Sequence, residues 1–300
     1  MRIGIFFPSV EHAAIDTMVA RFADAATQGF RSAWVPQSSS YDALTLLAIV
    51  GREVPGIELG TAVVPTYPRH PMMLAAQALT TNAATSGRLQ LGLGLSHKMV
   101  VEGSWGLSYE QPARHMEEYL AVLLPLLRNG EVDFAGEVVT GRGRIAVPDA
   151  SPCPVYLAAL QPRMLRLAGA VADGTITWCT GPITLAAHIV PIITEAASTA
   201  GRPAPRVVVA LPCCVTDDDG AGRAQAAEQL RGYGDIPVYR AVLDREGAAG
   251  PGDISIVGDE ASVSEQLHRL GAIGATDFMA IPCGTPADRA RTRAHLATLT

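Results

Sequence analysis

Residues 87–98 read GRLQLGLGLSHK, and this stretch indicates the fold class of the whole chain. It begins with Gly-Arg, a turn that stops a helix, and continues over residues 89–95 as an apolar run too short for a helix. A short apolar run between turn signals predicts a strand buried on both faces. In a parallel sheet with helical crossovers, polar residues at the carboxyl end of a strand are where chemistry usually takes place. The stretch therefore places a candidate site at Ser96-His97-Lys98.

Gly92 and Gly94 remove side chains from the predicted strand and so weaken it. One explanation is a flat ligand that approaches the strand backbone closely. The other is tight packing against a neighbouring segment of the protein. The glycines alone favour neither explanation.

Strand-like apolar runs alternate with helix-like segments along the whole chain. The expected strands are residues 3–7, 32–36, 57–64, 89–95, 154–159, 175–179, 206–215 and 277–282. The expected helical segments are residues 15–28, 42–53 with Asp42 as the N-cap, 72–85, 112–127, 162–172, 184–200, 220–246 and 262–270. Eight strand–helix units in 300 residues predict an α/β fold, specifically a (β/α)8 TIM barrel.

An open doubly wound sheet is the alternative architecture. It predicts a Gly-x-Gly-x-x-Gly turn that opens a helix. Gly92-Leu93-Gly94 lacks the third glycine and lies inside the predicted strand, so this signal is missing.

Residues 129–152 interrupt the alternation. Gly136, Gly141 and Gly143, together with alternating valines over residues 131–145, predict a β-hairpin insertion after the fourth strand–helix unit. The chain is otherwise expected to form one domain, residues 1–300.

The composition is that of a protein with a large buried core, because 48% of the residues are hydrophobic and 17% are charged. The formal net charge is −6 and the sequence has no basic cluster, so nucleic-acid binding is not expected. No apolar stretch of about 18 residues lacks polar breaks, so no membrane span is expected. The amino terminus has the pattern of a first strand and not of a signal peptide, which favours the cytoplasm.

The five cysteines are scattered and contain no Cys-x-x-Cys pair, so disulfides and a zinc site are not expected. The residues at the carboxyl ends of the predicted strands are called the strand exits. They also lack a carboxylate pair for glycoside hydrolysis, a Gly-x-Ser-x-Gly elbow and a metal-ligand cluster. Of the seven histidines only His97 is well placed. Exits that are mostly apolar or amide-like, with one histidine and the arginine Arg163, suit an organic cofactor that brings its own chemistry.

Three segments resemble the bacterial luciferase-like superfamily, and specifically its oxidoreductases that depend on the deazaflavin coenzyme F420. They are residues 59–66 with His70-Pro71 and Ala75-Ala76-Gln77, residues 87–94, and residues 154–159 with Pro162, residues 167–169 and residues 172–174. Each motif is weak alone, but the three occur in the family's order and at matching strands.

The resemblance implies a cofactor site at the strand exits. It implies a non-proline cis peptide bond between Ala62 and Val63, behind the central ring of the cofactor. It also implies that the helix opening at Pro162 binds the cofactor phosphate through its free N–H groups and dipole. The implied cofactor-binding residues are Gln37, Ala62, Val63, Leu95, Ser96, Val100, Leu160, Gln161, Arg163 and Met164. For Arg163, an ordinary solvated arginine is an equal alternative.

The sequence departs from the family's sugar-phosphate dehydrogenases, which place an Asp-His pair after the second strand and a glutamate after the fourth. Here these positions read Gln37-Ser38 and His97, so that substrate class is not expected. His97 is the candidate catalytic residue, since its ordinary pKa lies near neutrality; the alternative is a hydrogen bond to cofactor or backbone. Trp178 is predicted to form a wall of the substrate pocket, with a plain core aromatic as the alternative.

The resemblance implies a cytoplasmic enzyme that transfers a hydride between coenzyme F420 and a small organic substrate. One alternative is an FMN-dependent luciferase-like monooxygenase. Another is a flavin- or deazaflavin-binding protein without catalysis. A homodimer is the expected assembly, with no nucleic-acid, membrane or metal partner.

Overall fold

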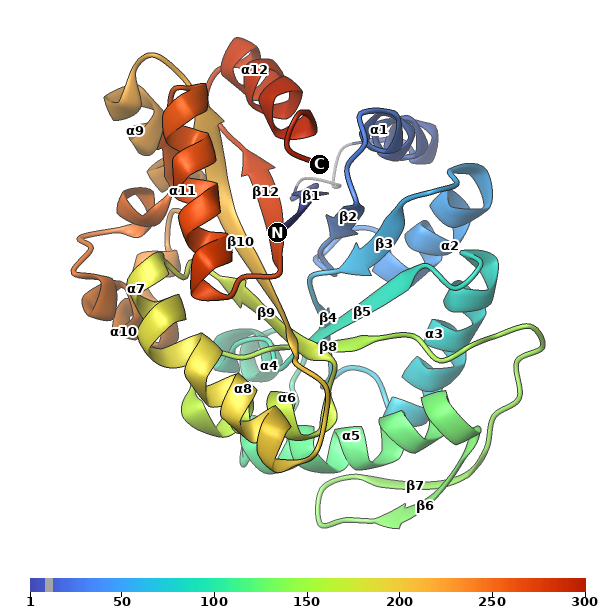
Figure 1. Ribbon diagram of the computed structural model, residues 1–300. Coiled ribbons are helices and arrows are strands. Elements are labelled where there is room, and N and C mark those ends of the chain that lie inside the picture. Colours follow the sequence, from blue (N-terminus) through green and yellow to red (C-terminus); the bar gives the residue numbers. More distant parts are fainter. Residues whose placement is uncertain (9–12) are drawn as a thin grey trace. The chain divides into compact units, whose positions relative to one another are not determined.

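The computed structural model describes residues 1–8 and 13–300 (Figure 1). The strands are β1 (Arg2–Phe6), β2 (Ser32–Val35), β3 (Glu58–Thr61), β4 (Val64–Pro65), β5 (Leu89–Gly94), β6 (Glu131–Ala135), β7 (Thr140–Arg144), β8 (Val155–Ala158), β9 (Gly174–Trp178), β10 (Arg206–Val215), β11 (Ile256–Gly258) and β12 (Asp277–Pro282). The α-helices are α1 (Ile15–Thr27), α2 (Ala43–Glu53), α3 (Pro71–Ala84), α4 (Lys98–Gly103), α5 (Pro112–Asn129), α6 (Pro162–Val171), α7 (Pro182–Thr184), α8 (Val190–Thr199), α9 (Asp219–Gln229), α10 (Pro237–Glu246), α11 (Glu260–Ile273) and α12 (Pro286–Ala297). A π-helical turn, Leu185–Ile189, joins α7 to α8, and short 3-10 helices occupy Tyr233–Asp235 and Pro251–Ile254.

The described residues form two compact units. Unit 1 comprises Met1–Pro8, Asp24–Trp34 and Ala159–Thr300, and unit 2 comprises residues 13–23 and Val35–Ala158. The expectation of a single domain over residues 1–300 stays a prediction.

Unit 1 contains a parallel sheet in which the first and last strands of the chain are neighbours. β1 pairs with β2 on one side and with β12 on the other, and β10 pairs with β12, β9 and β11. Pairing between the first and last strands is the connection that a barrel requires. With the strand–helix alternation, it confirms the prediction of an α/β fold of the (β/α)8 TIM-barrel class.

Most predicted elements of unit 1 are confirmed, and the strands over residues 206–215 and 277–282 match to the residue. The structure adds α12, whose sequence PADRARTRAHLA has too few apolar residues for a periodic pattern. Its start is instead encoded by a capping box: Thr285 Oγ1 accepts from the Asp288 N–H at 3.2 Å, and the Asp288 carboxylate accepts from the Thr285 N–H at 2.9 Å.

A buried carboxylate joins the amino-terminal ends of β10 and β12. Asp277 is 2% exposed. Its carboxylate accepts hydrogen bonds from Arg206 Nε at 3.0 Å and from Thr276 Oγ1 at 2.6 Å, and a second Arg206 nitrogen forms an ion pair with it. These contacts lie at the end of the strands opposite to their carboxyl-terminal exits, so they serve stability.

Unit 2 contains the central strand β5, which pairs in parallel with β3, β4 and β8. The predicted hairpin is confirmed as the antiparallel pair β6–β7, which packs on α5 (Figure 1). Its turn is held by Glu118 of α5, whose carboxylate accepts from the backbone N–H groups of Val138 at 2.8 Å and Val139 at 2.9 Å. The insertion is therefore anchored by a side chain outside it.

Arg88 shows why one of the family-like motifs has an arginine after the glycine. Its guanidinium donates to the backbone carbonyls of Gly51 at 2.7 Å, Val54 at 2.9 Å and Ile57 at 2.9 Å. These carbonyls lie at the end of α2 and in the turn after it, where a helix leaves backbone acceptors unpaired. Arg88 thus ties α2 to the start of β5.

Replacing Arg88 with Met is expected to lower the free energy of unfolding by about 2–4 kcal/mol, because three carbonyls lose a charged donor. Urea denaturation followed by circular dichroism measures the change. Arg52→Met is the matched control, since Arg52 is exposed on α2; its effect is expected within about 0.5 kcal/mol. Equal effects of the two substitutions would contradict the structural role of Arg88.

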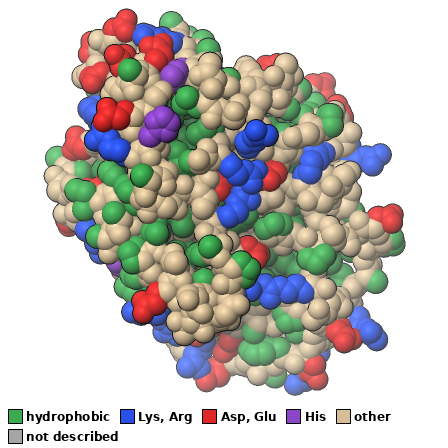
Figure 2. All heavy atoms as spheres, viewed as in Figure 1, with side chains coloured by type: hydrophobic (Ala, Val, Ile, Leu, Met, Phe, Trp, Pro, Cys, Tyr) green, Lys and Arg blue, Asp and Glu red, His purple; other side chains and the backbone are tan. Residues whose placement is uncertain are grey.

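On the face shown in Figure 2, basic side chains lie interspersed with acidic ones. Across the two described ranges, no helix has the length and apolar character needed to cross a bilayer. All five cysteines are buried and free.

Candidate active site

The predicted third strand is interrupted in the structure. It was expected to run continuously over residues 57–64, but β3 ends at Thr61 and β4 starts at Val64. The Ala62–Val63 peptide bond between them is cis, as the resemblance implied. At the interruption the Thr61 hydroxyl joins the end of β3 to β5, because it donates to the C=O of Gly92 and accepts from the N–H of Gly92, both at 2.9 Å.

For Gly94 of β5, the structure distinguishes between a ligand close to the strand backbone and tight packing against the protein. A Cβ atom added to Gly94 would lie 2.6 Å from Val63 Cγ2 and 3.5 Å from the Ala158 Cβ. The space beside Gly94 is therefore filled by protein side chains. Tight packing, and not a ligand at the strand backbone, accounts for this glycine.

Gly94→Ala is expected to lower the free energy of unfolding by about 1–3 kcal/mol, because the added methyl group overlaps the short, β-branched side chain of Val63. Thermal unfolding measures the effect. Gly250→Ala is the control, since a Cβ there meets no atom of the described residues within 4 Å and the φ of −155° suits any residue. A Gly94→Ala protein as stable as wild type would show that Val63 moves aside without cost.

The exit of β5 brings together the predicted residues Leu95, Ser96, His97 and Val100, all partly buried. Ser96 has a φ of 61°, the left-handed conformation that L-residues rarely adopt and that is often found at functional sites. His97 is the N-cap residue of α4, and its carbonyl accepts from the backbone N–H of Val100 at 2.9 Å. Burial lowers the pKa of His97 from 6.5, so its imidazole is neutral at pH 7 and is able to accept a proton.

An aromatic stack of Tyr67, Tyr109 and His115 lies beside this exit and was not predicted from the sequence. The rings of Tyr67 and His115 are stacked at 4.0 Å with an interplanar angle of 4°, and those of Tyr67 and Tyr109 at 5.3 Å with 29°. The Tyr109 hydroxyl donates to the backbone carbonyl of Ser96 at 3.4 Å. The aromatic stack thus borders the backbone of the predicted site.

His115 is expected to make stability depend on pH. Burial lowers its pKa to about 4, against 6.5 for an unperturbed histidine, although the charge of Glu118 acts in the opposite direction. Between these two values the unfolded chain binds more protons than the folded one, so stability falls as the pH drops from 6.5 towards 4.

Urea denaturation at pH 7.5, 6 and 5 tests this pH dependence. His115→Phe retains a stacked ring. Between pH 7.5 and pH 5 its free energy of unfolding is expected to decrease less than that of wild type. His268→Phe, at an exposed position of α11, is expected to keep the wild-type decrease. A His115→Phe protein with the wild-type decrease would assign the titration to other groups.

Gln37, a predicted cofactor-binding residue, takes part in a polar network at the start of α2. Its Oε1 accepts from the Ala43 N–H at 2.8 Å and from Arg69 Nη2 at 3.4 Å. Arg69 forms an ion pair with the capping residue Asp42, which also accepts from Gln77 Nε2 at 2.7 Å. The structure thus gives Gln37 a positioning role in its own loop that the sequence did not indicate.

In unit 1, the predicted phosphate-binding turn is the first turn of α6. Gln161 is its N-cap residue and makes no side-chain capping hydrogen bond, and Pro162 occupies the first helical turn. The exposed Arg163 and the buried Met164 follow. Leu160 is held from outside the turn, because its carbonyl lies 2.9 Å from His188 Nε2. The backbone N–H groups of this first turn have no partner within the helix, which is the arrangement that favours an anion.

Trp178, predicted to line a substrate pocket, belongs to an aromatic cluster of unit 1. Its ring contacts Phe6 at a centroid distance of 5.6 Å and Tyr233 at 5.7 Å. The next residue, Cys179, has a φ of 50°, and the Thr180 hydroxyl donates to the Trp178 carbonyl at 3.0 Å. The exit of β9 thus has a left-handed residue, as the exit of β5 does.

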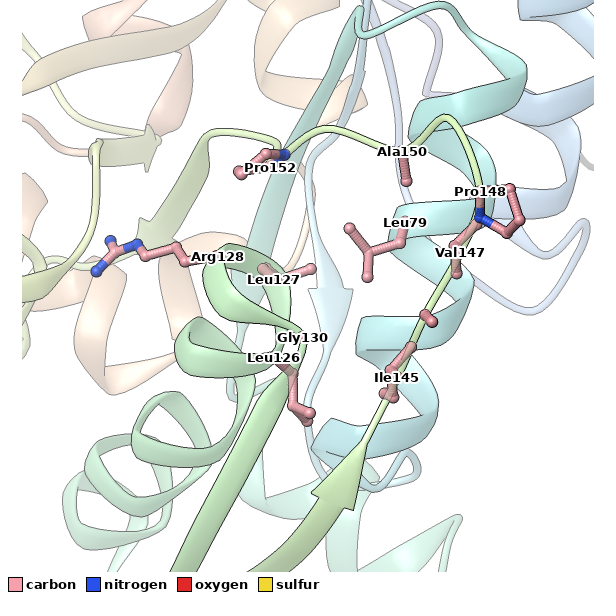
Figure 3. A pocket seen from close by; sticks show the side chains of 11 residues that line it. Leu79, Leu126, Leu127, Arg128, Gly130, Ile145, Val147, Pro148, Ala150 and Pro152 are labelled. Carbon is pink, nitrogen blue, oxygen red and sulfur yellow. The ribbon is translucent and has the colours of Figure 1, made fainter.

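Unit 2 also has a surface pocket of about 360 Å³ at the end of α5 (Figure 3). Figure 3 shows Leu79, Leu127 and Val147 around it, with the Arg128 side chain directed away from them. None of the predicted site residues lines this pocket. In the described parts of the chain, no three His, Cys, Asp or Glu side chains are grouped so that they would hold a metal ion.

Comparison with known proteins identifies relatives over nearly the whole length. The family model described as luciferase-like monooxygenase matches residues 1–296. The 5,10-methylenetetrahydromethanopterin reductase of Methanolobus tindarius is 28% identical over 278 residues, which cover 90% of this chain and 83% of that protein.

Two solved structures show the same fold. The coenzyme F420 dependent tetrahydromethanopterin reductase from Methanopyrus kandleri matches with a TM-score of 0.81 and 22% identity, covering 99% of this chain and 97% of that one. The oxygenating constituent of 3,6-diketocamphane monooxygenase from Pseudomonas putida, in complex with FMN, matches with a TM-score of 0.77 and 16% identity, covering 99% and 96%. Sequence identities this low establish the shared architecture alone.

Proposed function

Because this chain belongs to the luciferase-like monooxygenase family, we propose that it transfers a hydride between coenzyme F420 and a small organic substrate. The chain is a luciferase-like oxidoreductase, and relatives that use F420 and relatives that use FMN both occur among the proteins it resembles. The solved structures described as a coenzyme F420 dependent tetrahydromethanopterin reductase and an F420-dependent secondary alcohol dehydrogenase favour F420, with FMN as the second candidate.

The observation that carries the proposal is a pair of buried polar side-chain atoms on the segment that follows β4, the strand paired with the end of β5. The Tyr67 hydroxyl and Arg69 Nη1 are both shielded from solvent and have no hydrogen-bond partner among the described residues. Both lie on the segment between β4 and α3. The ring of a flavin or deazaflavin combines a flat face with carbonyl acceptors, so the residues present fit such a group. When bound, the cofactor supplies the hydride chemistry.

The protein's own residues would position the cofactor and exchange a proton with the substrate. Leu95 and Val100 offer apolar contact, and the left-handed Ser96 fixes the direction in which the chain leaves β5. His97, neutral because burial lowers its pKa, is proposed as the group that exchanges a proton with the substrate. In unit 1, the first turn of α6 is proposed to bind a phosphate group, with Arg163 adding positive charge.

Fluorescence titration of the purified protein with oxidised F420 and, separately, with FMN tests the proposal. Saturable binding of F420 alone is expected. Binding of FMN alone would move the assignment to a flavin-dependent monooxygenase, which oxygen consumption with reduced FMN would then check. Binding of neither cofactor would contradict the proposed function while leaving the fold and the family unchanged.

A further inference from the structure

Tyr67 has a buried hydroxyl that forms no hydrogen bond with the described residues. Solvent does not reach this oxygen, and no described residue lies within hydrogen-bonding distance in suitable geometry. An unpaired buried hydroxyl destabilises a protein, and most buried polar side-chain atoms have a partner. A bound group that completes the hydrogen bond would explain why a tyrosine is present here instead of a phenylalanine.

The Tyr67 ring is held in place by two aromatic neighbours. His115 stacks on it at 4.0 Å, and His115 is itself fixed by a hydrogen bond of 3.0 Å between its Nε2 and the Thr66 hydroxyl. Tyr109 stacks at 5.3 Å and is bonded through its own hydroxyl to the Ser96 carbonyl. The Tyr67 hydroxyl therefore keeps one position, as a binding group must.

A backbone contact places Tyr67 next to the strand that carries the predicted site. The Thr66 N–H donates to the Gly94 carbonyl at 3.0 Å, so Tyr67 follows directly on a residue that is bonded to the end of β5. Burial, and then the neighbouring Tyr109, raise the pKa of Tyr67 to about 12. At neutral pH the hydroxyl keeps its proton and is available as a hydrogen-bond donor.

We infer that Tyr67 is a cofactor-binding residue whose hydroxyl donates a hydrogen bond to a ring carbonyl of the flavin-type group. The inference rests on the proposed function, because it requires such a cofactor at the exit of β5. It does not depend on the choice between F420 and FMN, since both carry carbonyl groups on the same pyrimidine ring. A carbonyl oxygen accepts the hydrogen bond that no described residue accepts.

Tyr67→Phe is the test, because it retains the stacked ring and removes only the hydroxyl. In fluorescence titration with whichever of F420 and FMN wild type binds, Tyr67→Phe is expected to raise the Kd about five- to tenfold. The visible absorption maximum of the bound cofactor is expected to shift, because the hydrogen bond to the ring is lost. The melting temperature of the cofactor-free protein is expected to stay equal or rise, since an unpaired buried group is removed.

Tyr156→Phe is the matched control. Its hydroxyl donates to Gln90 Oε1 at 2.8 Å inside the protein, so this variant is expected to melt at a lower temperature and to bind the cofactor with the wild-type Kd. A Tyr67→Phe protein with the wild-type Kd and absorption maximum would overturn the inference and leave the proposed function standing. A lower melting temperature with an unchanged Kd would also overturn it, by assigning Tyr67 to structure. Failure of wild type to bind either cofactor would overturn both.

Discussion

Asp277→Asn is expected to lower the free energy of unfolding by about 3–5 kcal/mol, the range found when one partner of a buried ion pair is removed. The substitution keeps the volume of the side chain but leaves the Arg206 guanidinium opposite a neutral amide. Asp277 is 2% exposed, so water does not replace the lost charge. Urea denaturation at pH 7 measures the change.

Asp244→Asn is the control for Asp277→Asn. Asp244 pairs with Arg240 at 2.7 Å on the surface of α10, and such exposed pairs contribute less than about 1 kcal/mol. Cofactor affinity of the folded Asp277→Asn protein is expected to equal that of wild type, because Asp277 lies at the amino-terminal end of β12. A stability loss no greater than that of Asp244→Asn would refute the importance of the buried ion pair.

His97→Ala is expected to lower turnover more than about tenfold while the Kd of the cofactor stays within a few-fold of wild type, since general acid–base groups contribute at least this much. The two measurements are the steady-state rate with a substrate found by screening and the fluorescence titration used for the wild type. Lys98→Ala is the control, because Lys98 is exposed beside His97. A weaker cofactor affinity with unchanged turnover would assign His97 to binding.

The pH profile gives an independent check on His97. Burial lowers the pKa of this histidine below 6.5, so the neutral form predominates at neutral pH. If the reaction needs the neutral imidazole, kcat/KM is expected to be constant near pH 7 and to fall as the pH drops through the lowered pKa. His97→Ala should lack this acidic limb. An acidic limb that persists in the variant would point to another group.

Much of the fold could be predicted because its signals are local. Apolar runs between turn residues located the strands, and the N-cap Asp42 located the start of α2, where its carboxylate accepts from the Thr45 N–H at 2.8 Å. The interruption between β3 and β4 could not be predicted from periodicity, because apolar residues continue through it. The resemblance to a family, and not the pattern, indicated the Ala62–Val63 bond.

The candidate site was predictable only in part. A polar cluster after a buried strand was enough to select Ser96 and His97. The aromatic stack could not be predicted from the sequence because its three residues come from separate segments. Thr66, which precedes Tyr67, and its hydrogen-bond partner His115 are 49 residues apart, for example. Tyr67 and Tyr109 lie in loops and His115 lies in α5, so no local pattern in the sequence predicts that their rings are in contact.

The sequence by itself determined the strand–helix order, the barrel class and the position of the exit of β5, because hydrophobic periodicity, caps and turn residues act over a few neighbouring residues. Only the tertiary structure decided that Val63 fills the space beside Gly94, that Arg88 binds the end of α2 and that the hydroxyl of Tyr67 has no partner among the residues described. Such contacts depend on strand register and side-chain packing between distant segments. They arise only when the chain is folded.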